Sequence, residues 1–237
     1  MSRPRRLSTV GWRIALNPKR FRRIRRILTR RQPDLTVLME QVNKTHNFSA
    51  ILRNCDAVGI LEAHAVLPEK GVGLSDHTSA GTGKWIRVHR HRTVSEAADL
   101  LHGSGFRILA AHPSEGAVDF RRADYTRKVA IMVGAELEGI SQEGLTVADE
   151  RIVIPMAGMA RSLNVSVATA LVLYEAFRQR DAAGMYEESR LPPERFRRIL
   201  FEWTHPDLAE FFRRRGHPYP AMSEEGEALV EPGFNLP

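Results

Sequence analysis

The sequence predicts an α/β fold, in which a mainly parallel sheet carries helices on both faces. Short apolar runs rich in Val, Ile, Leu and Met alternate with longer stretches of helical spacing, and this alternation is typical of parallel sheets. No apolar run reaches the ~18 residues that a membrane span needs. The 237 residues are enough for one substantial core with terminal additions.

The elements are expected in the following order along the chain. Apolar or β-branched runs predict strands at residues 35–40, 62–67, 85–91, 106–111, 129–134 and 151–155. Apolar residues at helical spacing predict helices at residues 47–59, 94–103 and 163–180. A Gly/Ser-rich loop is expected at residues 71–84. Asn47 is predicted to be an N-cap, and Cys55, the one cysteine, to be buried filler that suits a reducing cytoplasm.

Residues 1–33 carry an uneven share of the positive charge. The formal net charge is +7, and this stretch holds twelve Lys or Arg and no acid. An apolar helical stripe runs through it: Phe21, Ile24, Ile27 and Leu28. The rest of the helix is covered by Arg20, Arg22, Arg23, Arg25, Arg26, Arg30 and Arg31. Such a helix can dock on a core and bind RNA phosphates; a solvated face and a transit peptide are the alternatives.

Both ends of the chain are expected to extend the central domain. Two short helices are predicted at residues 194–203 and 207–215, and the acidic, Pro/Gly-rich tail after Gly216 is expected to be poorly ordered. Residues 1–15 are expected to be a disordered leader or to follow a misplaced start codon. The predicted domains are residues 1–33, 34–182 and 183–237.

Polar residues gather where the strand at residues 151–155 gives way to the apolar helix at residues 163–180. Ser162, Asn164 and Ser166 lie at this crossing, where a helix N-terminus has unpaired N–H groups. An ordinary αβ crossover needs only one capping side chain, so three polar side chains suggest a site. The alternative is an ordinary crossover with more caps than it needs.

A second polar group follows the strand at residues 129–134. Gly134 and Gly139 permit a tight turn with the backbone close to a ligand. Glu136 lies between them, at the carboxyl end of the strand, where open α/β sheets bind ligands.

Three segments resemble, in this order, the motifs of the SPOUT superfamily of RNA methyltransferases, in its SpoU/TrmH branch. Residues 47–53 resemble the first motif and residues 134–139 the second. Residues 154–156 with 162–166 resemble the third. The flanking segments are similar to those of bacterial tRNA (guanosine-18-2′-O-)-methyltransferases, whereas residues 1–15 and the tail past about residue 216 show no such similarity.

The resemblance implies a fold and an activity. In this family the C-terminal segment threads a loop to make a deep trefoil knot, and the knotted loops hold S-adenosylmethionine. The implied reaction is methyl transfer to the ribose 2′-hydroxyl of guanosine 18 in tRNA. A homodimer through the helix at residues 163–180 and the helix starting at Asn47 is also implied; the alternative is that helix 163–180 is wholly buried within one subunit.

Site residues follow from the same resemblance. Arg53 would activate the nucleophile, and Asn47 would orient Arg53. Glu136, Ser162 and Asn164 would shape the site. The cofactor pocket would be lined by Ala111, Gly134, Ile154, Met156 and Leu163, although the family usually has a threonine at the first of these positions.

The role of Arg53 leaves alternatives open. A guanidinium stays protonated at neutral pH, so Arg53 could bind a phosphate and stabilise a developing alkoxide, which leaves the general base unassigned. The alternative is a surface ion pair with Asp56. The rival functions are 2′-O-methylation of ribosomal RNA or another tRNA ribose, and a catalytically silent RNA-binding dimer. No metal is expected, because the histidines lack ligand spacing.

Overall fold

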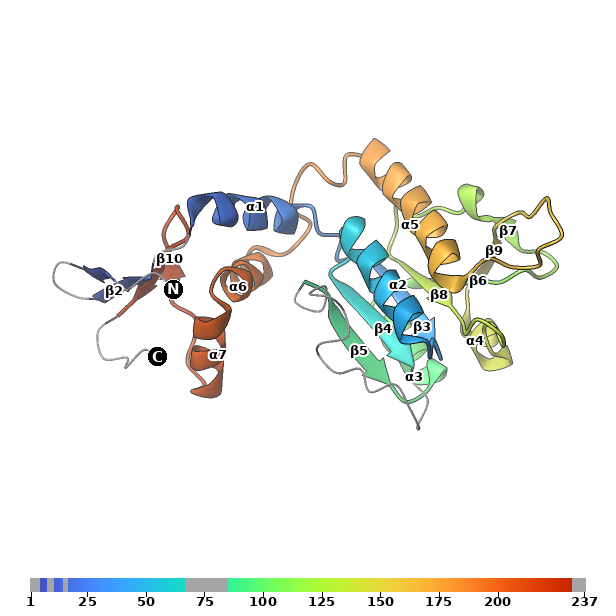
Figure 1. The fold of residues 1–237 in the computed structure, drawn as a ribbon, viewed down its shortest axis with the longest axis horizontal. Coiled ribbons are helices and arrows are strands. Elements are labelled where there is room, and N and C mark those ends of the chain that lie inside the picture. Colours follow the sequence, from blue (N-terminus) through green and yellow to red (C-terminus); the bar gives the residue numbers. More distant parts are fainter. Residues whose placement is uncertain (1–4, 8–10, 15–16, 67–84, 232–237) are drawn as a thin grey trace. The chain divides into compact units, whose positions relative to one another are not determined.

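The structure is a computed structural model that describes residues 5–7, 11–14, 17–66 and 85–231 (Figure 1). The predicted loop at residues 71–84 lies outside these ranges. The chain divides into two compact units. We call residues 31–187 the sheet unit, and residues 1–30 with 188–237 the terminal unit.

The sheet unit is built on a seven-stranded parallel sheet of order β5-β4-β3-β8-β6-β9-β7. Its strands are β3 (Leu35–Glu40), β4 (Glu62–Val66), β5 (Arg87–His91), β6 (Arg107–Ala111), β7 (Val118–Asp119), β8 (Val129–Val133) and β9 (Glu150–Val153). The central strands β3 and β8 are buried along their whole length, as expected for a sheet covered on both faces. The prediction missed only β7, which is two residues long and has no apolar run.

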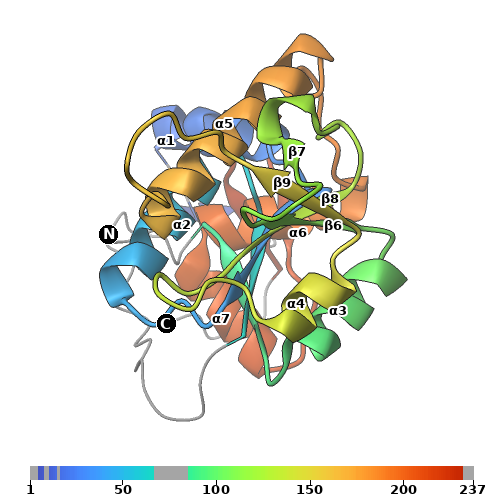
Figure 2. The same ribbon diagram turned by 90° about the vertical axis from the view of Figure 1, so that its right-hand side faces the viewer.

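Helices cover both faces of this sheet, as predicted (Figure 2). One face packs against α2 (Thr45–Ala57) and α5 (Val165–Ala182). The other packs against α3 (Val94–Gly103) and α4 (Gln142–Val147), the latter a short helix that the prediction missed. A 3-10 turn, η2 (Phe120–Arg122), lies between β7 and β8.

The first turn of α2 differs from the prediction. The N-cap is Lys44, and Asn47 lies buried inside the helix, so the predicted N-cap at Asn47 is wrong. The Asn47 side chain forms hydrogen bonds with residues of other segments instead of the backbone of α2. The preference of asparagine for N-cap positions therefore did not predict where α2 begins. Cys55 is buried, as predicted, and burial raises the pKa of its thiol.

One side of α5 faces solvent. The helix follows its N-cap Asn164, whose Oδ1 accepts a hydrogen bond from the backbone N–H of Ser166 at 2.9 Å. Three large side chains on the helix are well exposed: Val167 by 48%, Leu171 by 43% and Tyr174 by 55%. The alternative that α5 is wholly buried within one subunit is therefore wrong.

The terminal unit joins both ends of the chain in one antiparallel sheet of order β1-β2-β11-β10. Its strands are β1 (Arg5–Leu7), β2 (Gly11–Ile14), β10 (Ala221–Met222) and β11 (Ala228–Val230). Its helices confirm the three predicted here: α1 (Pro18–Thr29), α6 (Pro193–Thr204) and α7 (Pro206–Arg214). Within the described ranges, no helix of either unit is both long and apolar enough to cross a membrane.

Two predictions of disorder at the chain ends are wrong. The tail after Gly216 forms β10 and β11, and Ala228 and Val230 are buried. Residues 5–7 and 11–14 are strands of the same sheet, with Arg13 opposite Leu229; the rest of the predicted leader lies outside the described residues. Such strands depend on partners at the opposite end of the chain, which local patterns do not reveal.

Candidate active site

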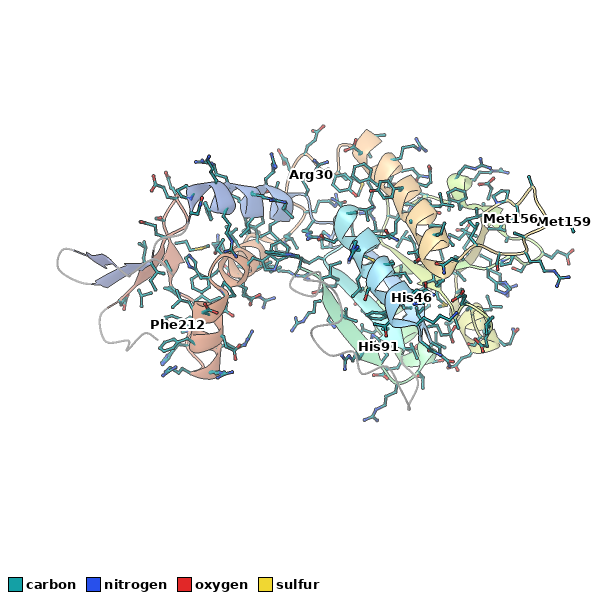
Figure 3. The ribbon with its side chains drawn as sticks, viewed as in Figure 1. Arg30, His46, His91, Met156, Met159 and Phe212 are labelled. Atoms are coloured by element: carbon teal, nitrogen blue, oxygen red, sulfur yellow. The ribbon has the colours of Figure 1, made fainter. Side chains whose placement is uncertain are left out.

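A pocket of about 710 Å³ lies at the carboxyl ends of β6, β8 and β9. Its volume is within the roughly 300–1,000 Å³ of small-molecule sites. The loop at residues 134–140 follows β8, the loop at residues 154–163 follows β9, and residues of both line the pocket. Met156 and Met159 lie on the second of these loops (Figure 3).

The loop at residues 134–140 depends on two glycines. The backbone N–H of Ala135 donates to the carbonyl of Gly139 at 3.0 Å, and the reverse bond has the same length. A Cβ on Gly134 would lie 2.0 Å from that carbonyl oxygen, and Gly139 has φ of +70°. Both positions therefore require glycine, which confirms the predicted tight turn.

All five residues predicted to hold the cofactor line this pocket: Ala111, Gly134, Ile154, Met156 and Leu163. Glu136 and Ser162 also line it, and both are exposed. The structure thus brings together seven of the ten residues predicted to bind cofactor or act in catalysis.

A chain of polar contacts links the three motif segments beside the pocket. Asn164 Nδ2 donates to Asn47 Oδ1 at 3.1 Å, and Asn47 Nδ2 donates to Glu136 Oε2 at 3.1 Å. The same carboxylate oxygen lies 2.6 Å from Lys44 Nζ. The hydrogen bond from Lys44, followed by its charge and the bond from Asn47, lowers the pKa of Glu136. Glu136 is therefore a carboxylate at neutral pH.

Arg53 lies apart from this chain of contacts. It is exposed, and among the described residues its guanidinium has no hydrogen bond or ion pair. Arg53 and Asn47 are six residues apart on α2, which places them about 120° apart around the helix. The structure therefore does not bring Arg53 to the residue expected to orient it.

The alternative pairing of Arg53 with Asp56 is wrong. Asp56 Oδ1 lies 2.5 Å from Nη2 of Arg31, whose side chain is only 1% exposed. Arg31 also donates from Nη1 to the carbonyl of Ile60 at 2.8 Å. This corrects the placement of Arg31 on the basic face, because its guanidinium is committed to the core of the sheet unit.

The basic helix α1 is amphipathic, as predicted. Phe21, Ile24 and Leu28 are buried, but Ile27 of the predicted stripe is exposed. The arginines predicted to bind RNA are all exposed: Arg20, Arg22, Arg23, Arg25, Arg26 and Arg30. Asn17 caps the helix by accepting from the backbone N–H of Lys19 at 2.9 Å.

Sequence reasoning missed three residues at or near the pocket. Lys44 holds Glu136, and Glu40 holds Ser141 just after the loop at residues 134–140. His112 lines the pocket. No local pattern marks Lys44 or Glu40, because their partners are distant in the sequence.

The pocket fits S-adenosylmethionine by its chemistry. Val133, Ile140 and Ile152 provide apolar walls for an adenine ring and a methylene chain. Nδ1 of His112 is buried and has no hydrogen-bond partner among the described residues, so a ligand can satisfy it. The described part of the chain contains no group of three or more His, Cys, Asp or Glu that could hold a metal ion.

Comparison with known proteins covers both units of the chain. Residues 34–174 match the SpoU rRNA Methylase family, and residues 178–230 match the family described as SpoU, rRNA methylase, C-terminal. The second match corrects the expectation that the tail past about residue 216 is unlike that of related proteins.

Individual relatives agree with these matches. The tRNA (guanosine(18)-2′-O)-methyltransferase of Escherichia coli (strain K12) is 53% identical over 214 residues, which are 90% of this chain and 93% of the relative. The crystal structure of the A. aeolicus TrmH/SpoU tRNA modifying enzyme has a TM-score of 0.74 at 42% identity, covering 80% of this chain and 97% of that one. An AdoMet-bound rRNA methyltransferase from Sinorhizobium meliloti has a TM-score of 0.57 at 29% identity. The match covers 65% of this chain and 59% of that one. From its matched sequence and its fold, this chain belongs to the SpoU methylase family of RNA methyltransferases.

Proposed function

We propose that this protein transfers a methyl group from S-adenosylmethionine to the ribose 2′-hydroxyl of guanosine 18 in tRNA. The observation that carries the proposal is the contact chain from Asn164 through Asn47 to Glu136, which joins three motif segments beside a cofactor-sized pocket. The similarity to the E. coli relative spans both units, which supports a shared substrate as well as a shared reaction.

The residues of this chain act mainly by position and charge. S-adenosylmethionine supplies an electrophilic methyl group, so the protein must place the ribose hydroxyl in line with it and assist proton loss. The backbone of residues 134–140 and 154–163 holds the cofactor. Arg53, exposed and without a partner among the described residues, stabilises the developing alkoxide and binds the adjacent phosphate.

Asn47 and Asn164 position the catalytic carboxylate. The Asn47 amide donates to Glu136 and is itself held by the Asn164 amide, and Lys44 keeps the carboxylate ionised. Ser162 lines the pocket without a hydrogen bond to any described residue, so its hydroxyl is available to substrate. The general base stays unassigned.

Two rivals are tested against this proposal. If the substrate is ribosomal RNA or another tRNA ribose, the ribose of guanosine 18 in the transcript should not be methylated. A catalytically silent RNA-binding dimer requires that no methyl transfer occurs at all. Purified protein incubated with labelled S-adenosylmethionine, a tRNA transcript and EDTA separates these outcomes, because our proposal expects methylated tRNA without metal. We place the reaction in the cytoplasm, where tRNA is available and a free thiol such as Cys55 stays reduced.

The arginines of α1 are proposed to bind tRNA phosphates. Arg22→Ala with Arg26→Ala keeps the buried stripe of the helix, so the fold is expected to survive. The double variant should lower the slope of log affinity against log salt by about two units, because each lost phosphate contact removes about one. It should also raise the KM for tRNA and leave cofactor binding unchanged.

Two other arginines of the terminal unit provide a matched control for α1. Arg197 is bonded to Glu194 at 2.7 Å and Arg214 to Glu210 at 2.5 Å, so each charge is partly neutralised by a neighbouring acid. Changing this pair to alanine should reduce the salt slope by less. An unchanged slope in the α1 variant would mean that its arginines are only a solvated face.

We further propose a homodimer in which the exposed apolar side of α5 packs against a second copy, next to α2. Leu171→Glu places a charge on that side and is expected to give a monomer in sedimentation at micromolar concentration, because an unpaired charge is costly to bury. Leu100→Glu is the control, since Leu100 is equally apolar and exposed on α3. A monomeric wild-type protein would contradict the proposal.

A further inference from the structure

A buried carboxylate lies between the end of β3 and the start of α4. Glu40 is the last residue of β3 and is 3% exposed. Ser141 donates to it twice, from Oγ to Oε1 at 2.5 Å and from its backbone N–H to Oε2 at 3.0 Å. Ser141 Oγ in turn accepts from the backbone N–H of Gly144 at 3.0 Å, as the N-cap of α4. Glu40 therefore anchors the residue at which α4 begins.

The surroundings leave Glu40 little freedom. A side chain at Gly144 would collide with Glu40, because its Cβ would lie 2.7 Å from Glu40 Oε2 and 2.7 Å from Ile140 Cγ2. Among the described residues, Glu40 has no ion pair with a Lys, Arg or His side chain. Burying a carboxylate without a cation is costly, so the two bonds to Ser141 are what stabilise it in place.

The backbone turns sharply directly after Glu40. Gln41 has φ of +51°, and it is the one non-glycine residue of the described chain with a positive φ. Its N–H donates to the carbonyl of Val66 at 2.9 Å. Such a backbone persists only where the surrounding structure enforces it, and here it allows β3 to end with its carboxylate directed at Ser141.

The anchored residue adjoins the cofactor pocket. Ser141 directly follows Gly139 and Ile140, which both line the pocket. The loop at residues 134–140 is tied at its middle, where Glu136 meets Asn47. Its carboxyl end is tied by the contact of Ser141 with Glu40.

We propose that Glu40 is a positioning residue that fixes the carboxyl end of the cofactor loop through Ser141. This inference rests on the proposed function, in which the loop holds S-adenosylmethionine. A carboxylate can accept from both donors of Ser141, whereas a glutamine amide would turn an N–H donor toward one of them. The loop in a Glu40→Gln protein would therefore lose its defined end, and the cofactor would bind less tightly.

The experiment measures S-adenosylmethionine binding by calorimetry on the full chain. Glu40→Gln should raise the Kd about tenfold, since a charge-assisted hydrogen bond is lost. Its kcat at saturating cofactor and tRNA should stay within about threefold of wild type, because Arg53 and Asn47 are untouched. Ser141→Ala removes only the hydroxyl, so it should raise the Kd less. The double variant should raise the Kd by less than the two single changes combined, because both break the Glu40–Ser141 contact and only the loss of the Ser141 cap on α4 adds to it.

Glu143→Gln is the matched control. Glu143 is an exposed residue of α4 that also accepts from a serine, Ser95 Oγ, at 2.6 Å, but it does not line the pocket. Its Kd should equal that of wild type.

The outcomes distinguish this inference from the function on which it rests. Wild-type protein that neither binds S-adenosylmethionine nor methylates tRNA would remove the proposed function. Functional wild-type protein with a Glu40→Gln variant of unchanged Kd, or with strictly additive single variants, would overturn the positioning role. If Glu40→Gln does not fold, the Kd of Ser141→Ala decides: an unchanged value overturns the proposal.

Discussion

Arg53→Ala is expected to abolish detectable methyl transfer, a loss of at least about a hundred- to a thousandfold in kcat. The guanidinium is exposed, has no partner among the described residues, and is proposed to stabilise charge that develops on the ribose oxygen. Alanine is a good helix former, so α2 should persist. Single-turnover methylation of a tRNA transcript measures the rate, and calorimetry should show cofactor affinity unchanged.

Two further variants sharpen this prediction. Arg53→Lys keeps the charge but loses the planar pair of donors, so it should restore only part of the rate. Arg127→Ala removes another exposed arginine, one whose Nε lies 3.1 Å from Asp124, and should leave the rate unchanged. Activity of Arg53→Ala within a few-fold of wild type would remove Arg53 from the mechanism.

Arg180→Ala should cause the largest loss of stability, about 3–5 kcal/mol in the free energy of unfolding. Arg180 is fully buried near the end of α5. Its guanidinium donates to Asp34 Oδ1 at 2.6 Å and to the carbonyls of Tyr125 at 2.8 Å and Arg127 at 2.7 Å. Removing it takes the arginine partner from a buried carboxylate and a hydrogen bond from several carbonyls, so the cost exceeds that of one hydrogen bond. Denaturant titration followed by circular dichroism measures it.

The neighbouring Arg178 is a matched control for stability. It lies two residues earlier on α5 and pairs with Glu175 at 2.7 Å, but its side chain is 66% exposed. A surface pair of this kind contributes about 0.2–1 kcal/mol, so Arg178→Ala should unfold nearly as wild type. Equal losses for the two variants would contradict the anchoring role of Arg180.

Local patterns were enough to predict the main elements of the sheet unit. The apolar runs of β3 and β8 are buried on both faces, and the two glycines of the loop at residues 134–140 meet as their spacing suggested. These features depend on neighbours in the sequence or on burial alone. The trefoil knot stays a prediction, since it depends on chain threading and not on any local pattern.

Predictions that depended on distant partners were less successful. The sequence predicts that Asn47 caps its own helix, but its side chain forms hydrogen bonds with Glu136 and Asn164. Arg31 was placed on the basic face, but it lies buried against Asp56. The strand β11 was missed altogether, because it is stabilised by pairing with β2.

The candidate site shows the same division. The resemblance identified ten residues for catalysis and cofactor binding, and the structure brings seven of these to one pocket. Lys44 and Glu40 were not predicted as site residues, because neither lies in a recognisable pattern. Their roles follow only from the contact of Lys44 with Glu136 and of Glu40 with Ser141. Residues that hold a site together are therefore harder to find from sequence than residues that line it.

The most direct test of the central claim compares two tRNA transcripts that differ only in the sugar of nucleotide 18. One carries guanosine and the other 2′-deoxyguanosine, and both are incubated with the protein and labelled S-adenosylmethionine. We predict label in the first alone, with mass mapping placing one methyl group on the ribose of guanosine 18. Equal labelling of both transcripts, or a methyl group at any other nucleotide, would contradict the account.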